Sequence, residues 1–240
     1  MSSGPETPAG AMSRESSPTF KDRVRDLARA ALDPITTVLR RMGIGPDIMT
    51  VAGLLLSIVA ALLFFEGYFR LAAGVVALSG VCDILDGELA RRSGRRSRFG
   101  AFLDSTLDRL SDGLVLSGIA GFYLGHLTKM VLDPSLAVDA ISRGLEIQTW
   151  EVVSLTAVLA MVGSFMVSYT RARAEGLGLE CRVGWFERPE RMILLIIAAL
   201  FGVGPVMSAA LVLLTLLSFA TAAQRVAYVW KKTRGAGRDA

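Results

Sequence analysis

Four aspartates in two pairs could carry out most of the chemistry that this sequence suggests. Asp83 and Asp86 are spaced i,i+3, and Asp104 and Asp108 are spaced i,i+4. In a helix, residues at either spacing project from the same face. Two such faces turned toward each other would form an all-oxygen pocket, which suits hard divalent cations such as Mg²⁺ or Mn²⁺. We therefore expect the two pairs to form a metal site.

The residues between the two pairs favour phosphate binding. Gly87 and Gly100 lack a Cβ, so backbone or ligand can approach closely there. A salt-bridged helical hairpin with no chemistry is the alternative, but it would not require these glycines or the double spacing. Guanidinium groups bind phosphate well. The arginines of this stretch are Arg91, Arg92, Arg95, Arg96 and Arg98.

Long apolar segments adjoin both pairs and indicate an integral membrane protein. Leu71–Leu85 leads into the first pair, and Leu110–Leu124 follows the second. A carboxylate at the centre of a membrane helix costs ~2.5–3.5 kcal/mol on insertion scales, so four of them need a metal, water or arginine in compensation. A hydrophobic fraction of 52% and a mean hydropathy of +0.49 are too high for an ordinary soluble domain of 240 residues.

Hydropathy divides the chain into helices and tails. It predicts an all-α protein with six membrane-spanning helices, at about 47–66, 70–91, 99–125, 149–173, 189–203 and 206–230. They form one domain at 44–232. Ahead of it, residues 20–43 have apolar side chains at helical spacing, which predicts an amphipathic helix in the membrane interface; simple packing of this helix on the protein is the alternative. Residues 1–19 are expected to be a disordered tail, and residues 233–240 a basic one.

The distribution of arginine and lysine predicts the orientation in the membrane. The loops at 91–98 and 171–191 and the C-terminal tail are basic, and the opposite loops contain few cations. The positive-inside rule therefore places both termini and the aspartates on the cytoplasmic side of the cell membrane. Because the net charge of +4 resides at helix ends, we expect no nucleic-acid partner. We expect His126, in the connection that follows the third helix, to be an ordinary exposed residue.

A second group of arginines lies on the same side as the aspartates. Arg171 and Arg173 end the fourth predicted helix, Arg191 begins the fifth, and Arg225 lies within the apolar sixth. They could bind a phosphorylated substrate; anchoring by the positive-inside rule is the alternative. An arginine within a span marks a candidate functional site, although it can also snorkel to the interface.

The aspartate stretch follows a pattern known from one enzyme family. It reads D-x-x-D-G-x-x-A-R, then eight residues, then G-x-x-x-D-x-x-x-D. The pattern resembles the signature of the CDP-alcohol phosphotransferase family, with every fixed position matched. The resemblance extends from about Gly45 to Arg225. The fixed positions are Asp83, Asp86, Gly87, Ala90, Arg91, Gly100, Asp104 and Asp108.

The resemblance implies roles for the aspartates and for the donor site. It implies that Asp83, Asp86, Asp104 and Asp108 hold two Mg²⁺ or Mn²⁺ ions, with Asp108 as general base; spacing alone would allow Asp104 or Asp108 as the base. Family members have a P-[DN]-x-x-T stretch that contacts the nucleotide. The residues expected to bind the CDP-lipid are Asp47, Thr50, Gly87, Arg91 and Ser97.

The second arginine group resembles one branch of that family. The run SYTRARAE, followed by ERPER and later Gln224-Arg225, is similar to the bacterial branch that makes phosphatidylinositol phosphate, although that branch often has lysine in place of Arg171. This implies transfer of a phosphatidyl group from CDP-diacylglycerol to inositol phosphate, with release of CMP, by a homodimer in the membrane. The residues expected to hold the acceptor phosphate are Arg171, Arg173, Arg191 and Arg225.

Three alternatives stay open. The acceptor could be glycerol 3-phosphate, or an unphosphorylated alcohol such as serine, which would leave the second arginine group without a ligand. A cation transporter is an alternative from another class, but the acids lie toward one membrane face and no inverted repeat is visible. Release of CMP separates the enzymes from the transporter.

Overall fold

The computed structural model of the chain describes residues 34–92, 97–136, 138 and 147–236. Long helices dominate this part, and it contains no strand. The helices are α2 (Pro46–Phe65), α3 (Phe69–Arg92), α4 (Arg98–Leu132), α6 (Ile147–Glu175), α7 (Arg188–Leu200) and α8 (Pro205–Ala236). They agree closely with the predicted helices, except that α4 and α8 continue well beyond their predicted ends. Residues 34–41 are also helical, whereas most of the predicted amphipathic helix and the tail at 1–19 lie outside the described residues.

Local sequence signals explain where three of the helices begin. Pro46 starts α2 directly after Gly45, and Asp47 adds an acidic group to the first turn. Ser97 caps α4, because its hydroxyl accepts a hydrogen bond from the amide of Gly100 at 2.8 Å. At α7, Glu187 is the capping residue and a proline lies in the first turn.

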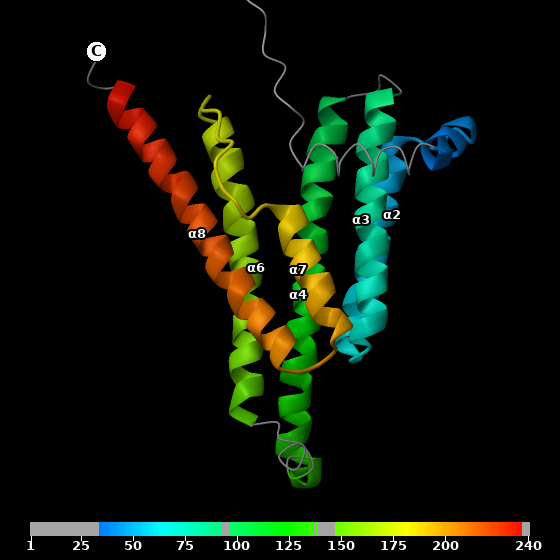
Figure 1. The fold of residues 1–240 in the computed structure, drawn as a ribbon, viewed down its shortest axis with the longest axis vertical. Coiled ribbons are helices and arrows are strands. Elements are labelled where there is room, and N and C mark those ends of the chain that lie inside the picture. The colour runs from blue at the N-terminus through cyan, green and yellow to red at the C-terminus, as the bar shows by residue number, and fades with distance from the viewer. Residues whose placement is uncertain (1–33, 93–96, 137, 139–146, 237–240) are drawn as a thin grey trace, which may run out of the picture.

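The helices form a bundle in which α7 bridges two groups (Figure 1). α2 packs against α3 and α4, α6 packs against α4 and α8, and α7 contacts both α3 and α8. Gly202 and Gly204, both with positive φ, form the turn that reverses the chain between α7 and α8. In Figure 1, α7 begins well below the upper ends of α3, α4 and α6, so its first residues lie inside the bundle.

An aromatic cluster closes the core at the opposite end from the aspartates. The ring of Phe69 meets those of Phe64 and Phe122 edge to face, at centroid distances of 5.1 and 5.0 Å. His126 lies 4.2 Å from Phe122 and 5.4 Å from Trp150, between ring centroids, and it is half-buried. The expectation of an exposed histidine was therefore wrong. Because α4 continues past residue 125, His126 lies on the same helix face as Phe122, one turn earlier.

Among the described residues, four helices are long and apolar enough to cross a membrane: α2, α4, α6 and α8. The other two differ for clear reasons. α7 has 13 residues, about 20 Å of helix against a bilayer core of ~30 Å, and α3 contains acidic and basic residues in its last turns. Large apolar side chains such as Leu62, Leu155 and Leu216 are exposed on the outside of the bundle. This surface and these helices fit an integral membrane protein.

Gly118 sets the distance between α2 and α4, and its replacement by alanine should weaken their packing. A Cβ at this position would lie 2.3 Å from the carbonyl oxygen of Ala61, which is backbone and cannot rotate away. We expect Gly118→Ala to lower stability by about 1–3 kcal/mol, measured as the unfolding midpoint in detergent. Gly125→Ala on the same helix is the control, because no atom lies within 4 Å of its Cβ. Equal midpoints for the two variants would contradict this account.

Candidate active site

Aspartates from two helices meet at one arginine. Asp83 comes from α3 and Asp108 from α4. Both carboxylates contact Nη1 of Arg188, which lies 2.8 Å from an oxygen of Asp108. Two carboxylates far apart in the sequence therefore face the same point, and that point holds a positive charge.

Arg188 belongs to a larger charge network at the start of α7. Its Nε lies 3.1 Å from one oxygen of Asp112, and Nη2 of Arg191 lies 3.0 Å from the other. The side chain of Asp112 is 8% exposed, and that of Arg188 is 19% exposed. Asp112 therefore lies between two arginines. Sequence analysis missed Arg188 as a site residue, although it lies one helical turn before Arg191 in the ERPER run.

The predicted metal ligands have the chemistry that a divalent cation needs. Among residues 34–92, 97–136 and 147–236, no group of three or more His, Cys, Asp or Glu side chains is arranged to hold a metal ion. The carboxylates of Asp83 and Asp108 nevertheless share a cation, and Asp86 accepts a hydrogen bond from Thr50 at 2.9 Å. Hard carboxylate oxygens directed at a shared positive charge are the donor set that Mg²⁺ and Mn²⁺ prefer. The residues present therefore fit such an ion.

A donor cavity of about 350 Å³ brings together the residues predicted to bind the CDP-lipid. It lies between the start of α2, the end of α3 and the start of α4, and Asp86 and Asp104 also line it. A Cβ at Gly100 would lie 3.3 Å from a carboxylate oxygen of Asp47, so glycine permits this close approach. The predicted residues that line the cavity are Asp47, Thr50, Gly87, Arg91 and Ser97.

A smaller cavity of about 180 Å³ contains three of the four arginines predicted to hold the acceptor phosphate. These are Arg171, Arg191 and Arg225. The fourth, Arg173, lines neither this cavity nor its two neighbours. Residues two apart on a helix do not share a face, so Arg173 and Arg171 point in different directions. We call this space the acceptor cavity.

Glu187 holds two of these arginines in place. Its carboxylate lies 3.2 Å from Nη2 of Arg225 and 3.8 Å from Nη1 of Arg171. Arg225 is 2% exposed and also donates to the carbonyl oxygens of Val183 and Val167, at 2.8 and 2.6 Å. Arg225 therefore points into the protein, and the snorkelling alternative does not apply to it.

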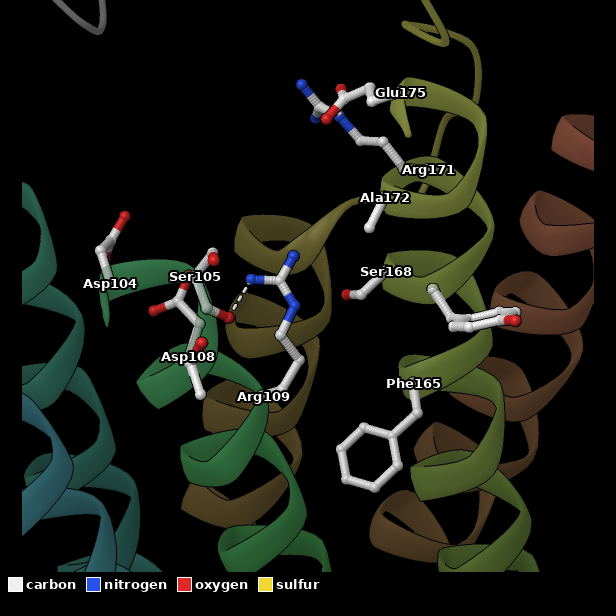
Figure 2. A pocket seen from close by; sticks show the side chains of 11 residues that line it. Asp104, Ser105, Asp108, Arg109, Phe165, Ser168, Arg171, Ala172 and Glu175 are labelled. Atoms are coloured by element: carbon white, nitrogen blue, oxygen red, sulfur yellow. Dashed lines mark hydrogen bonds and ion pairs between the residues drawn. The ribbon is translucent and has the colours of Figure 1, made fainter. Parts of the chain in front are cut away.

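A third and larger cavity, of about 760 Å³, opens between α4 and α6 (Figure 2). It shares Asp104 with the donor cavity. It shares Asp108, Arg109, Ser168 and Arg171 with the acceptor cavity. Asp104 therefore lies where the large cavity adjoins the donor cavity, and Asp108 lies where it adjoins the acceptor cavity. A substrate on each side would meet at these two carboxylates.

A sequence model of one family covers most of the chain. The description of that family is CDP-alcohol phosphatidyltransferase, and it matches residues 44–224. The chain belongs to this family. It is therefore a transferase.

Relatives and solved structures agree with this assignment. The archaetidylinositol phosphate synthase of Methanothermobacter thermautotrophicus is 37% identical over 217 residues, covering 89% of this chain and 95% of that protein. The phosphatidylinositol phosphate synthase of Streptomyces avermitilis is 34% identical over 242 residues, covering 94% and 91%. The crystal structure of the Mycobacterium tuberculosis phosphatidylinositol phosphate synthase with CDP-DAG bound aligns with a TM-score of 0.66 at 34% identity, over 82% of this chain and 92% of that one. A structure of the same enzyme with manganese and citrate gives a TM-score of 0.67.

Asp112 should be essential for stability, because it neutralises buried arginine. In Asp112→Asn, the guanidinium of Arg191, which is 5% exposed, loses its only carboxylate among the described residues. Removing one partner of a buried ion pair costs about 3–5 kcal/mol. We expect a loss of this size in detergent unfolding experiments. Glu180→Gln, which breaks the exposed pair with Arg182, is the control and should change stability by less than about 1 kcal/mol. Similar effects of both variants would argue against the network.

Proposed function

We propose that the protein transfers a phosphatidyl group from CDP-diacylglycerol to a hydroxyl of inositol phosphate, giving phosphatidylinositol phosphate and CMP. The observation that carries this proposal is that the large cavity adjoins the donor cavity at Asp104 and the arginine-lined acceptor cavity at Asp108, one helical turn apart on α4. The relatives support it, because one is named archaetidylinositol phosphate synthase and the other phosphatidylinositol phosphate synthase. The M. tuberculosis structure with CDP-DAG bound supports the donor.

The donor cavity would hold the cytidine and pyrophosphate of the lipid. Asp47 and Thr50 offer polar contacts at the start of α2, and Gly87 leaves the backbone of α3 open to a phosphate. Arg91 and Ser97 add hydrogen-bond donors for the pyrophosphate. The acyl chains would stay in the bilayer, because the outside of the helices is apolar.

Divalent cations, Mg²⁺ or Mn²⁺, would be held by Asp83, Asp86, Asp104 and Asp108, and we propose two ions. The manganese complex of the M. tuberculosis enzyme supports a divalent metal. Bound at these carboxylates, the ions would supply positive charge that stabilises the leaving CMP.

The acceptor cavity would bind the phosphate of inositol phosphate and present its hydroxyl to Asp108. Three helices each contribute an arginine to this cavity, namely Arg171, Arg191 and Arg225. An anion bound there would therefore be contacted from several sides. Asp108 lines the same cavity and would take the proton of the attacking hydroxyl. The hydroxyl oxygen then bonds to the phosphorus of the phosphatidyl group, and the bond from that phosphorus to CMP breaks.

Release of CMP tests this function directly. Purified protein receives CDP-diacylglycerol and Mg²⁺ with inositol phosphate, glycerol 3-phosphate, free inositol or serine, and the archaetidyl counterpart of the donor is tested in parallel. We expect CMP with inositol phosphate, and a loss of at least about a hundredfold in Asp108→Asn because general base catalysis contributes roughly 10²–10⁴. A preference for glycerol 3-phosphate would support phosphatidyl transfer from CDP-diacylglycerol but reject inositol phosphate as the acceptor. If folded protein released no CMP with any acceptor, the proposed phosphatidyl transfer would be rejected.

We further propose that all six helices cross the cell membrane, with both termini and the active site in the cytoplasm. α3 and α7 would be enclosed by their neighbours, because α3 packs on α2 and α7 packs on α3 and α8. The amphipathic segment at 20–43 would lie along the cytoplasmic face of the membrane. The domain itself would comprise residues 44–232, with short tails on either side. Homodimer formation is proposed from the family resemblance.

Cysteine labelling tests the orientation. The native Cys82 and Cys181 are buried and should contribute little background. We expect Lys232→Cys, after the last span, to react with a membrane-impermeant maleimide only when cells are opened. Lys129→Cys, at the far end of α4, should react in intact cells. The reverse pattern would invert the topology, and labelling of both positions from one side would contradict the six spans.

A further inference from the structure

Arg109 differs from the other arginines around the acceptor cavity. Asp112 pairs with Arg188 and Arg191, and Glu187 pairs with Arg171 and Arg225. Arg109 forms no ion pair with a carboxylate in the described part of the chain. Its Nη1 donates to the carbonyl oxygen of Ser105, one turn earlier on α4. The five arginines that line this cavity are Arg109, Arg171, Arg188, Arg191 and Arg225.

The position of Arg109 relates it to the substrate rather than to the fold. It follows Asp108 directly and lines both the acceptor cavity and the larger one between α4 and α6. Figure 2 shows its guanidinium reaching up from α4 beside Asp108, on the side that faces Ser168 and Arg171 of α6. Among the described residues, the side chain of Arg109 makes a hydrogen bond only through Nη1, so Nε and Nη2 are available to a ligand.

The half-buried guanidinium of Arg109, with donors that are free to bind a ligand, favours the binding of an anion in the acceptor cavity. Charged groups inside a membrane protein normally pair with one another or with backbone carbonyls. Arginines outnumber carboxylates in the lining of the acceptor cavity, and a phosphate monoester carries about −1.5 to −2 at neutral pH. The Nε and Nη2 donors of an arginine match two phosphate oxygens in a bidentate arrangement.

We propose that Arg109 binds the phosphate of the acceptor and holds the attacking alcohol beside Asp108. This inference rests on the proposed function and adds a residue that selects phosphorylated over neutral acceptors. Because Arg109 and Asp108 are neighbours on α4, a phosphate bound to one fixes the distance of the hydroxyl from the other. The resulting specificity comes from a cation that forms no close ion pair with a carboxylate among the described residues.

The test compares Arg109→Gln and Arg109→Lys with the matched control Arg182→Gln, whose side chain is 81% exposed and lines none of the three cavities. Calorimetry measures the binding of inorganic phosphate and of inositol phosphate to the full chain in detergent. We expect Arg109→Gln to weaken both about tenfold or more, as for a lost hydrogen bond to a charged group. Arg109→Lys should recover part of the loss, because it restores charge without the fork.

Kinetics and donor binding separate this role from a structural one. We expect the acceptor KM to rise in Arg109→Gln while CDP-diacylglycerol binding and Mn²⁺ affinity, followed by electron paramagnetic resonance, stay within about twofold of the unaltered protein. Preference for inositol phosphate over free inositol should fall. Unchanged phosphate affinity, or equal losses of phosphate, CDP-lipid and Mn²⁺ binding, would overturn the proposal. If the unaltered protein binds phosphate at Arg109 but makes no product from inositol phosphate, the proposed function fails and this phosphate site stands.

Discussion

The structure depends on the compensation of charge inside an apolar bundle. Asp83, Asp108 and Asp112 all contact Arg188, and Asp112 also holds Arg191. Without these partners, carboxylates and guanidinium groups at this depth would be strongly unfavourable. The network requires that α7 begin inside the bundle, and the loop after α6 descends to bring it there (Figure 1). The short length of α7 follows from the same requirement, since the helix covers only the lower part of the bundle.

The same charges divide the polar end of the protein into compartments. Asp112 and Glu187 each hold two arginines, so the acceptor cavity has walls of fixed positive charge. On the other side of Asp104, the donor cavity has small residues and polar groups from three helix ends. The two reacting partners can therefore approach the aspartates from different directions. In the proposed reaction, a lipid donor would enter from the bilayer and a water-soluble acceptor from the solvent.

Local patterns predicted most of the helices, because each is an apolar run bounded by a turn signal. α2 begins at Pro46 and α4 at Arg98, each within one residue of the predicted starts at 47 and 99. The prediction failed at the far end of α4, where His126, Thr128 and Lys129 interrupt the apolar run but the helix continues to Leu132. Hydropathy measures contact with lipid, and a helix that continues beyond the membrane no longer shows that signal. The partial burial of His126 could not be predicted either, because its partner Trp150 comes from another helix, α6.

By itself, the sequence determined the all-helical fold with apolar helices, the family and the placement of the aspartates in two pairs on two helices, since these depend on residue type and on spacing within single helices. The five residues that it assigned to the donor line one cavity, because they lie at the ends of adjoining helices. Only the tertiary structure decided which arginines face the site. It placed Arg188 and Arg109 at the aspartates and left Arg173 outside the cavities. The side-chain direction of an arginine near a helix end depends on the rotation and depth of that helix against its neighbours, and no local pattern encodes either.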